Sequence, residues 1–446
     1  MENVTEPVEA IAEHAGVDRG KPASLLPRPT AHEHLRQVVR SPITVAAVVF
    51  ALYGAWLMSL NGTGNHPYEM IWVGARFLHQ SQASPTITAF GGTPCTDSDV
   101  LHGIDHCNTP IWAIGYDGQF FYYLALDPVN ARYYMDVPTY RYTRIVYPLV
   151  ARTVALGRLD LVPLTLMLVN WLAIAGGTLA LAAWLRRKRL SPWFALVYAL
   201  YPGMQVTLAR DLSEALAYGL VVLAVYLFEF GPRYRLVLAA GVFALAALTR
   251  ESTAIFGLAY AGAILFQGAA GNDWRARIRS NWQQALGFSI LALAPLVLYK
   301  AFLLVWIGPT QDVGIPLASL PFQGIWHWRY WLAYGQIDQT EGVVIPGLIC
   351  GVVATVALWR RGSRTALWLL LANVLLFIVF LQPDAYSEIE ASSRVTTGVV
   401  LSAILSLAVI GDVPARQGWF WASSALWLSV MPVWLLFGTL AYFVKL

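Results

Sequence analysis

Long apolar segments separated by short polar stretches run along this chain from residue 42 onward. A helix needs about 20 apolar residues to cross the hydrocarbon core of a bilayer. The pattern therefore predicts an all-α membrane protein with about eleven transmembrane helices. These are expected at 42–60, 162–185, 192–209, 213–230, 236–250, 253–268, 284–307, 343–359, 366–382, 395–411 and 418–440. Very tight connections join the third to the fourth span and the fifth to the sixth, and two of these spans are short. We expect them to be tilted, broken or only partly spanning.

The polar stretches divide the chain into a tail and a membrane domain. Residues 1–41 are polar and mixed in charge, with no apolar core of a secretory signal. They are predicted to be a disordered cytoplasmic tail ahead of a multi-spanning domain at 42–446. The longest loop of that domain is 61–161. Within it, 68–79 and 144–157 mix apolar and polar residues at helical spacing, which predicts helices lying in the membrane interface.

Composition supports the membrane assignment and excludes one class of partner. Hydrophobic residues make up 57% of the chain and charged residues only 13%, whereas about a quarter of a soluble chain is charged. The 18 tryptophans are typical of rings at membrane–water interfaces. The formal net charge of +4 is too small to indicate a nucleic-acid partner, so membrane lipids are the expected surroundings.

Basic residues are concentrated in alternate loops, which predicts the orientation of the chain. The basic set is Arg186, Arg187, Lys188, Arg189, Arg233, Arg235, Arg275, Arg277, Arg279, Arg360, Arg361, Arg364 and Arg416. The intervening loops hold about one arginine each, namely Arg210, Arg250, Arg329 and Arg394. Because basic loops stay in the cytoplasm, the N-terminus is predicted inside and the loop 61–161 outside. An odd number of spans then places the C-terminus outside.

The most informative polar stretch is residues 115–123, Gly-Tyr-Asp-Gly-Gln-Phe-Phe-Tyr-Tyr. It places the lone carboxylate of Asp117 in an aromatic setting within the predicted outer loop. A carboxylate so placed can accept a proton from an incoming hydroxyl group. Asp117 is therefore the candidate catalytic residue.

Other ionisable residues gather at the outer ends of the predicted spans. They are Arg141, Arg144, Arg210, Asp211, Glu214, Arg250, Glu251, Lys300, Glu388, Glu390 and Arg394. Charge near membrane depth is costly and marks function by default. Arginines bind phosphate through charge-assisted hydrogen bonds, so these residues suit a substrate with an anionic head and an apolar tail. The alternative is that the Arg210–Asp211 and Arg250–Glu251 neighbours are ion pairs that only cap helices.

Two cysteines of the outer loop, Cys95 and Cys107, are separated by eleven residues. A disulfide between them is expected in an oxidising compartment, and two free thiols are the alternative. The third cysteine, Cys350, lies inside a predicted span.

The segment between those cysteines also carries potential metal ligands. Asp97 and Asp99 have a spacing at which two carboxylates can share a divalent cation. His102 and His106, with Asp105 between them, would suit zinc. A solvated loop closed by the disulfide explains the same residues more simply, and we favour it.

The residues that follow Asp117 carry turn and interface signals. Asp127 and Pro128 predict the end of a helix. Tyrosines after this point are predicted to be interfacial anchors, with stacking on sugar rings as the alternative: Tyr133, Tyr134, Tyr140, Tyr142 and Tyr147.

Several chemistries are not indicated. No histidine lies within a predicted span, which argues against an intramembrane serine protease or a histidine-dependent acyltransferase. No phosphate-binding loop or dinucleotide fingerprint occurs. Transporters tend to place ionisable groups or broken helices at the midplane. The charges of this chain lie on one side instead, which favours an enzyme at the outer interface.

Taken together, these motifs resemble the C-type superfamily of integral-membrane glycosyltransferases. The likeness rests on the long first outer loop with Tyr-Asp-Gly-Gln at 116–119, Tyr-Arg-Tyr-Thr-Arg-Ile-Val-Tyr-Pro at 140–148, Arg-Asp-Leu-Ser-Glu at 210–214 and Leu-Thr-Arg-Glu at 248–251. It covers roughly 42–400 and is nearest to bacterial members that share Gly-Tyr-Asp-Gly-Gln-Phe.

The resemblance implies inverting transfer of a sugar from a polyprenyl-phosphate carrier, on the non-cytoplasmic face of a bacterial inner membrane. Asp117 matches the acid that serves as base, or that binds a metal in some branches, so a divalent cation remains open. Arg210, Arg250 and Arg394 match residues that bind the lipid phosphate. Family members often place the acid soon after the first span. Glu69 lies nearer to it, and Asp97 and Asp99 form an acid pair seen in some branches, so these are the alternative acids.

The expectation from sequence is therefore a membrane glycosyltransferase acting on a lipid, glycan or protein acceptor. Asp117 would deprotonate the acceptor, and Arg210 and Arg250 would stabilise the leaving phosphate. Arg141, Arg144 and Lys300 are further candidates for the phosphate. The carrier's tail would lie near the short fifth and sixth spans. The alternatives are a transporter or flippase of a lipid-linked saccharide, and a structural subunit.

Overall fold

The structure is a computed structural model of residues 1–446. It describes residues 38–61, 67–78, 82–91, 115–267, 274–309, 317–326, 339–362, 364–386, 389–411 and 416–429. The chain divides after Val39, and the larger unit runs from Arg40 onward. The predicted tail at 1–41 lies almost entirely outside the described residues.

The described residues form helices and turns and contain no strand, as the prediction of an all-α chain requires. Five of the helices are long and apolar enough to cross a membrane. They are Pro42–Ser59, Leu159–Arg187, Trp274–Trp306, Thr340–Arg361 and Ile389–Ile410. Three shorter apolar helices accompany them: Arg235–Thr249, Glu251–Leu265 and Thr365–Val379. The chain is thus compatible with a multi-pass membrane protein, and the count of eleven spans stays a prediction.

The predicted third span, 192–209, is wrong as a continuous helix. It consists of a 3-10 turn, η4 (Pro192–Phe194), followed by α12 (Ala195–Ala199) and α13 (Pro202–Ala209). The break lies at Tyr201, which is extended with φ −61° and ψ 136°. The ring of a proline disfavours helical geometry in the residue before it, so Pro202 ends one helix and begins the next.

Most other boundaries lie close to those predicted. The remaining apolar helices are α2 (Pro42–Asn61), α11 (Val162–Arg187), α14 (Glu214–Phe230), α15 (Arg235–Thr249), α16 (Ala254–Leu265), α17 (Trp274–Trp306), α20 (Ile345–Arg361), α21 (Thr365–Val374) and α22 (Ile389–Ile410). Helix α17 begins ten residues before the predicted start at 284, because its first turns are polar and hydropathy does not detect them. The last predicted span is helical over 418–429, and its remainder lies outside the described residues.

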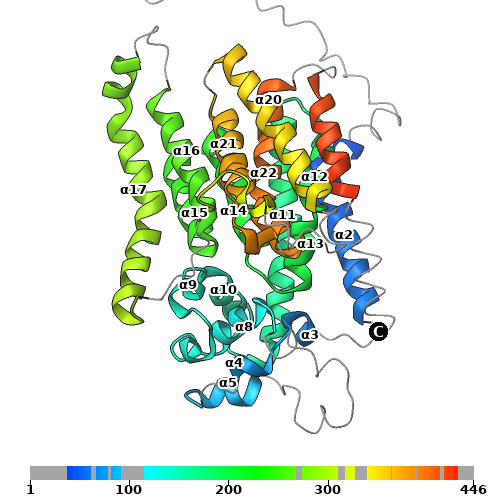
Figure 1. Ribbon diagram of the computed structural model, residues 1–446, viewed down its shortest axis with the longest axis vertical. Helices are drawn as coiled ribbons and strands as arrows, with labels where there is room; N and C mark the ends of the chain where they lie inside the picture. Colours follow the sequence, from blue (N-terminus) through cyan, green and yellow to red (C-terminus); the bar gives the residue numbers. More distant parts are fainter. Residues whose placement is uncertain are drawn as a thin grey trace, which may run out of the picture. The chain divides into compact units, whose positions relative to one another are not determined.

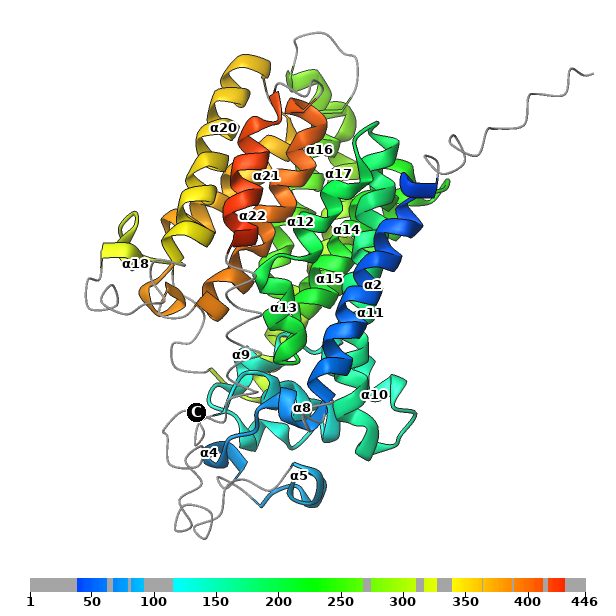
Figure 2. The same ribbon diagram turned by 90° about the vertical axis from the view of Figure 1, so that its right-hand side faces the viewer.

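Helix α22 lies at the centre of the bundle, between α21 and α13 (Figures 1 and 2). In an 18-residue apolar stretch of this helix, 89% of the residues are buried, as expected for a helix without an exposed face. The hydroxyl groups of Thr397 and Ser402 donate to the carbonyls four residues earlier, which satisfies them inside the core. Gly203 of α13 packs so closely that an added Cβ would lie 2.5 Å from the carbonyl oxygen of Ser393.

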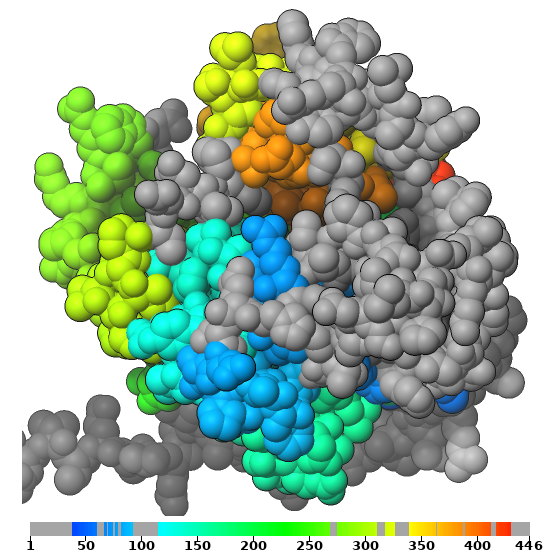
Figure 3. All heavy atoms as spheres, turned by 60° about the horizontal axis from the view of Figure 1, so that its bottom comes forward, coloured from blue at the N-terminus to red at the C-terminus, as the bar shows by residue number. Residues whose placement is uncertain are grey.

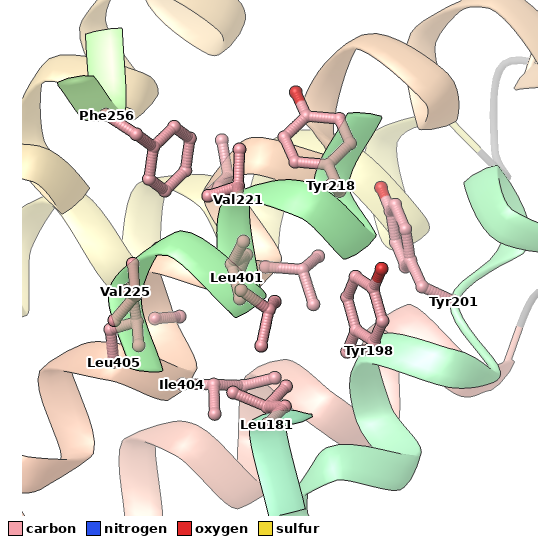
Figure 4. Packing of buried hydrophobic residues seen from close by; sticks show 14 of the residues in the cluster. Leu181, Tyr198, Tyr201, Tyr218, Val221, Val225, Phe256, Leu401, Ile404 and Leu405 are labelled. Atoms are coloured by element: carbon pink, nitrogen blue, oxygen red, sulfur yellow. The ribbon is translucent and has the colours of Figure 1, made fainter. Parts of the chain in front are cut away.

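The main core cluster brings together α11, α12, α14, α16 and α22. Figure 4 shows Leu181, Tyr198, Val221, Phe256 and Leu401 converging from these five helices. All five side chains are fully buried. In contrast, α17 packs against α15 and α16 through one face and exposes large apolar side chains on the rest, as a helix in contact with lipid would.

The predicted outer loop folds into short helices below the bundle (Figure 1). They are α3 (Pro67–Ile71), α4 (Ala75–Leu78), α5 (Pro85–Phe90), α8 (Gly118–Leu126), η2 (Ala131–Tyr134), α9 (Pro138–Tyr142), α10 (Val146–Val154) and η3 (Leu159–Leu161). The predicted helix at 68–79 is interrupted over 72–74, and that at 144–157 is confined to α10. Helix α8 ends before Asp127, as predicted.

Three of the five predicted tyrosine anchors are wrong. Tyr134, Tyr142 and Tyr147 are fully buried and use their hydroxyl groups inside the protein. The hydroxyl of Tyr142 donates to the carbonyl of Pro128 at 2.9 Å. The hydroxyl of Tyr147 donates to the carbonyl of Leu166 at 3.1 Å. These rings therefore belong to a second core cluster, which lies between the short helices and α11.

Candidate functional site

The Gly-Tyr-Asp-Gly-Gln motif begins α8 and is fastened to the break between α3 and α4. The backbone N–H of Tyr116 donates to the carbonyl of Trp72 at 3.0 Å. The side-chain oxygen of Gln119 accepts the backbone N–H of Gly74, also at 3.0 Å. Trp72 itself has a φ of 53°, a left-handed conformation that is uncommon for a large residue. The interruption of the predicted interfacial helix thus leaves backbone groups of Trp72 and Gly74 available to hydrogen-bond with the motif.

The two glycines of the motif are required by close contacts. Gly115 has a φ of 70°, and a Cβ there would lie 2.5 Å from the backbone nitrogen of Gly74. A Cβ on Gly118 would lie 2.2 Å from the carbonyl oxygen of Arg210. Only glycine allows so close an approach. The motif is therefore held directly against the turn between α13 and α14.

Asp117 lies between two arginines that are far from it in sequence. Its Oδ1 accepts a hydrogen bond from Arg141 of α9 at 2.9 Å, and its Oδ2 accepts one from Arg394 of α22 at 3.3 Å. The carboxylate is 25% exposed, and the arginines are 12% and 10% exposed. Asp117 is thus a partly open carboxylate with a guanidinium on each oxygen.

The charges around Asp117 keep it ionised. Burial alone would raise its pKa, but the positive charges of Arg141, Arg394 and Arg144 outweigh burial and hold the pKa below its usual range. Arg141 is fixed from a second side by Asp136, whose carboxylate it contacts at 2.7 Å. Its guanidinium also lies 4.4 Å from the centre of the Phe120 ring.

Behind Asp117 lies a deeper layer of ion pairs. Arg250 contacts Glu214 at 2.5 Å, and both side chains are almost fully buried. Arg394 reaches the same Glu214 oxygen at 3.6 Å. Arg144 contacts Glu251 at 2.9 Å. The alternative in which Arg250 pairs with its neighbour Glu251 is therefore wrong, because each residue pairs with a partner from another element.

Arg210 lies beside an acidic residue and two aromatic rings. Its guanidinium lies 3.9 Å from Glu390, at the limit of a direct contact. It also lies 4.0 Å from the centre of the Trp72 ring, and Trp72 stacks on Tyr116. A cation over an aromatic face is stabilised by the ring quadrupole. The rings of Trp72 and Tyr116 thus help to orient Arg210. The alternative in which Arg210 pairs with Asp211 is wrong, because both side-chain oxygens of Asp211 are buried and have no hydrogen-bond partner among the described residues.

Two predicted site residues do not take part in the ion pairs described around Asp117. Asp211 has a φ of 48° and is fully buried, and burial raises its pKa well above the usual value. The amide of Asn170 donates to the carbonyl of Leu212 at 2.9 Å and so supports this turn. Lys300 is exposed on α17, and no contact joins it to the group around Asp117.

Several candidates cannot be placed. Glu69 belongs to α3, but the structure describes only its backbone. The predicted disulfide of Cys95 and Cys107 and all candidate metal ligands of that loop lie in 92–114, outside the described residues. Glu388 is outside them too. Within the described part of the chain, no group of three or more His, Cys, Asp or Glu side chains could hold a metal ion. Cys350 is buried in α20 as a free thiol.

The structure adds residues that the sequence pattern did not single out. Trp72 and Tyr116 form the aromatic wall beside Arg210, and Asp136 orients Arg141. Asn170 was inconspicuous because one polar residue in an apolar span gives no spacing signal. Figure 3 looks onto this end of the protein, where the segments of residues 67–78 and 82–91 (blue) lie beside that of residues 115–160 (cyan to green).

No protein-family model, curated protein or solved structure matches this chain. The resemblance to C-type glycosyltransferases therefore rests on the sequence motifs alone, and function must be argued from the geometry of the site.

Proposed function

We propose that this protein is a membrane glycosyltransferase that takes its sugar from a polyprenyl-phosphate carrier. The observation that carries the proposal is the position of Asp117, a partly exposed carboxylate between Arg141 and Arg394 with Arg210 nearby. An acid that can accept a proton lies next to guanidinium groups that can bind a phosphate. Transfer of a sugar from a phosphate to a hydroxyl needs both groups at one place.

In this reaction the acceptor hydroxyl oxygen attacks the anomeric carbon, and the bond from that carbon to the phosphate oxygen breaks. The hydroxyl proton passes to Asp117, and the bond electrons leave with the carrier phosphate. Arg210 is the best candidate to bind that phosphate, because its guanidinium lies beside the Trp72 and Tyr116 rings near Asp117 and bidentate phosphate contacts are strong. Arg394 and Arg141 would share the added charge.

The resting carboxylate of Asp117 is a weak base, because its pKa is low. An anionic phosphate that draws Arg394 or Arg141 towards itself would weaken their hold on Asp117. It would also raise the carboxylate's pKa by repulsion between like charges. Asp117 would thereby become a stronger base only when the donor is bound.

The decisive experiment follows loss of label from radiolabelled polyprenyl-phosphate sugars in membranes that contain the purified protein. Asp117→Asn keeps the shape of the side chain and removes its basicity. We expect it to lower turnover about a hundredfold or more, as removal of a general base does, while donor binding persists. Asp136→Asn is the matched control, because Asp136 contacts the same Arg141 and should cost far less activity.

The other outcomes separate the alternatives. Equal turnover by Asp117→Asn and wild type would move the base to Glu69 or to the Asp97 and Asp99 pair. Movement of the intact lipid-linked sugar across the membrane, without cleavage from any donor, would identify a transporter and overturn the proposal.

A further inference from the structure

At the end of α20 far from Asp117, a pocket of about 1000 Å³ opens between α20, α22, Arg364 and Arg416. Its described lining combines four arginines with apolar side chains, and none of the described lining residues is acidic. The residues that matter here are Val352, Val356, Arg360, Arg361, Arg364 and Arg416. The pocket shares no residue with the group around Asp117.

The charges and the apolar side chains of this pocket are separated along α20. Val352, Val356 and Arg360 follow one another at four-residue intervals, so they lie on one face of the helix. Eight residues of helix span about 12 Å. An occupant that follows this face therefore meets valine side chains first and guanidinium groups about 12 Å further on. Such an order fits a molecule with an apolar chain and an anionic head.

The arginines lie at the depth expected for lipid headgroups. Trp359 at the end of α20 and Trp368 in the first turn of α21 are both exposed. Exposed tryptophans at helix ends mark the membrane–water interface. Arg360 and Arg364, also exposed, lie within four residues of these rings. Arg361 donates to the carbonyl of Val409 and so joins α20 to α22 behind the pocket.

We infer that this pocket binds an anionic phospholipid, with the phosphate at Arg360 and Arg364 and one acyl chain along Val352 and Val356. Basic pockets between transmembrane helices recognise anionic lipid headgroups in this way. The exposed apolar face of α20 beside the arginines favours a lipid over a soluble anion, because a soluble anion would leave that face without a partner.

The test measures retention of lipid by the full chain in detergent, by native mass spectrometry. Phosphatidylglycerol is compared with phosphatidylcholine of the same acyl chains. Each arginine near a headgroup contributes about 1 kcal/mol, so Arg360→Gln with Arg364→Gln should weaken phosphatidylglycerol binding about thirtyfold. The matched control replaces Arg233, between α14 and α15, and Arg279, near the start of α17, which are both exposed and should change binding little.

A second variant tests the apolar part of the pocket. Val356→Trp fills the space for the acyl chain without changing charge, and it should also weaken retention. The unfolding temperature of each variant shows that it is folded. Equal retention of both lipids, or equal loss in the control pair, would overturn the inference. Displacement of phosphatidylglycerol by inorganic phosphate or glycerophosphoglycerol would overturn it too, by identifying a soluble anion as the occupant.

Discussion

At the scale of single residues, the carboxylate of Asp117 has two arginine partners and an open side. Arg141 and Arg394 come from α9 and α22, which lie more than two hundred residues apart in sequence. Two guanidinium groups on one carboxylate stabilise its ionised form. The same arrangement could bind an anion, because each arginine can replace part of its contact with Asp117 by a contact with a substrate phosphate.

The contact of Asp117 with Arg141 and Arg394 predicts how the stability of the folded protein depends on pH. The pKa of Asp117 is lowered in the folded state, so its contribution to stability is present above the unfolded-state pKa of about 3.9. That contribution is lost as the pH falls towards the folded-state value. Wild type should therefore unfold at a temperature a few degrees above that of Asp117→Asn between pH 5 and 7. The difference should shrink below pH 4. Unfolding temperatures in detergent measure it, and a constant difference would contradict the assignment.

At the scale of elements, long apolar helices were well predicted and the site geometry was not. Boundaries of α14 and α15 follow directly from the hydropathy pattern, because lipid requires a long apolar run. Only the proline itself marks the break at Pro202 in the sequence, because the apolar pattern continues across it. Asp117, Arg141 and Arg394 were named individually, but their contact could not be deduced. Pairing across the chain depends on tertiary packing, which the apolar pattern does not contain.

The junction of α8 with the α13–α14 turn is the element contact that places Asp117. A methyl group on Gly118 would clash with the backbone of Arg210, and a backbone carbonyl cannot move as a side chain can. We expect Gly118→Ala to cost about 1–3 kcal/mol of stability and to lower turnover by displacing Asp117. Unfolding temperature and sugar release measure the two effects.

The matched control for this substitution is Gly176→Ala. Gly176 lies inside α11, and a Cβ there meets nothing within 4 Å. Alanine is favoured over glycine in a helix by about 1 kcal/mol, so this variant should be at least as stable as wild type. Unchanged stability and activity in Gly118→Ala would show that the close contact is not required.

At the scale of the whole molecule, arginines have different surroundings at the two ends of the bundle. Around Asp117 each arginine has an acidic partner within 4 Å. The pocket at the far end has four arginines, and no acidic residue is found among its described lining residues. Paired charges tolerate burial, whereas a concentration of arginines is typical of the cytoplasmic surface. This asymmetry agrees with the predicted orientation, in which the Asp117 site faces outward.

Helix α11 allows that orientation to be tested along a single element. It ends beside Arg186, and the turn containing Asp160 precedes it; both residues are exposed. Twenty-six helical residues span about 39 Å, enough to cross a bilayer. With Cys95, Cys107 and Cys350 replaced by alanine, Asp160→Cys should react with a membrane-impermeant maleimide in intact cells. Arg186→Cys should react only after permeabilisation. The reverse pattern would place the Asp117 site inside the cell and exclude a carrier presented on the outer face. Labelling of both cysteines in intact cells would contradict a membrane-spanning α11.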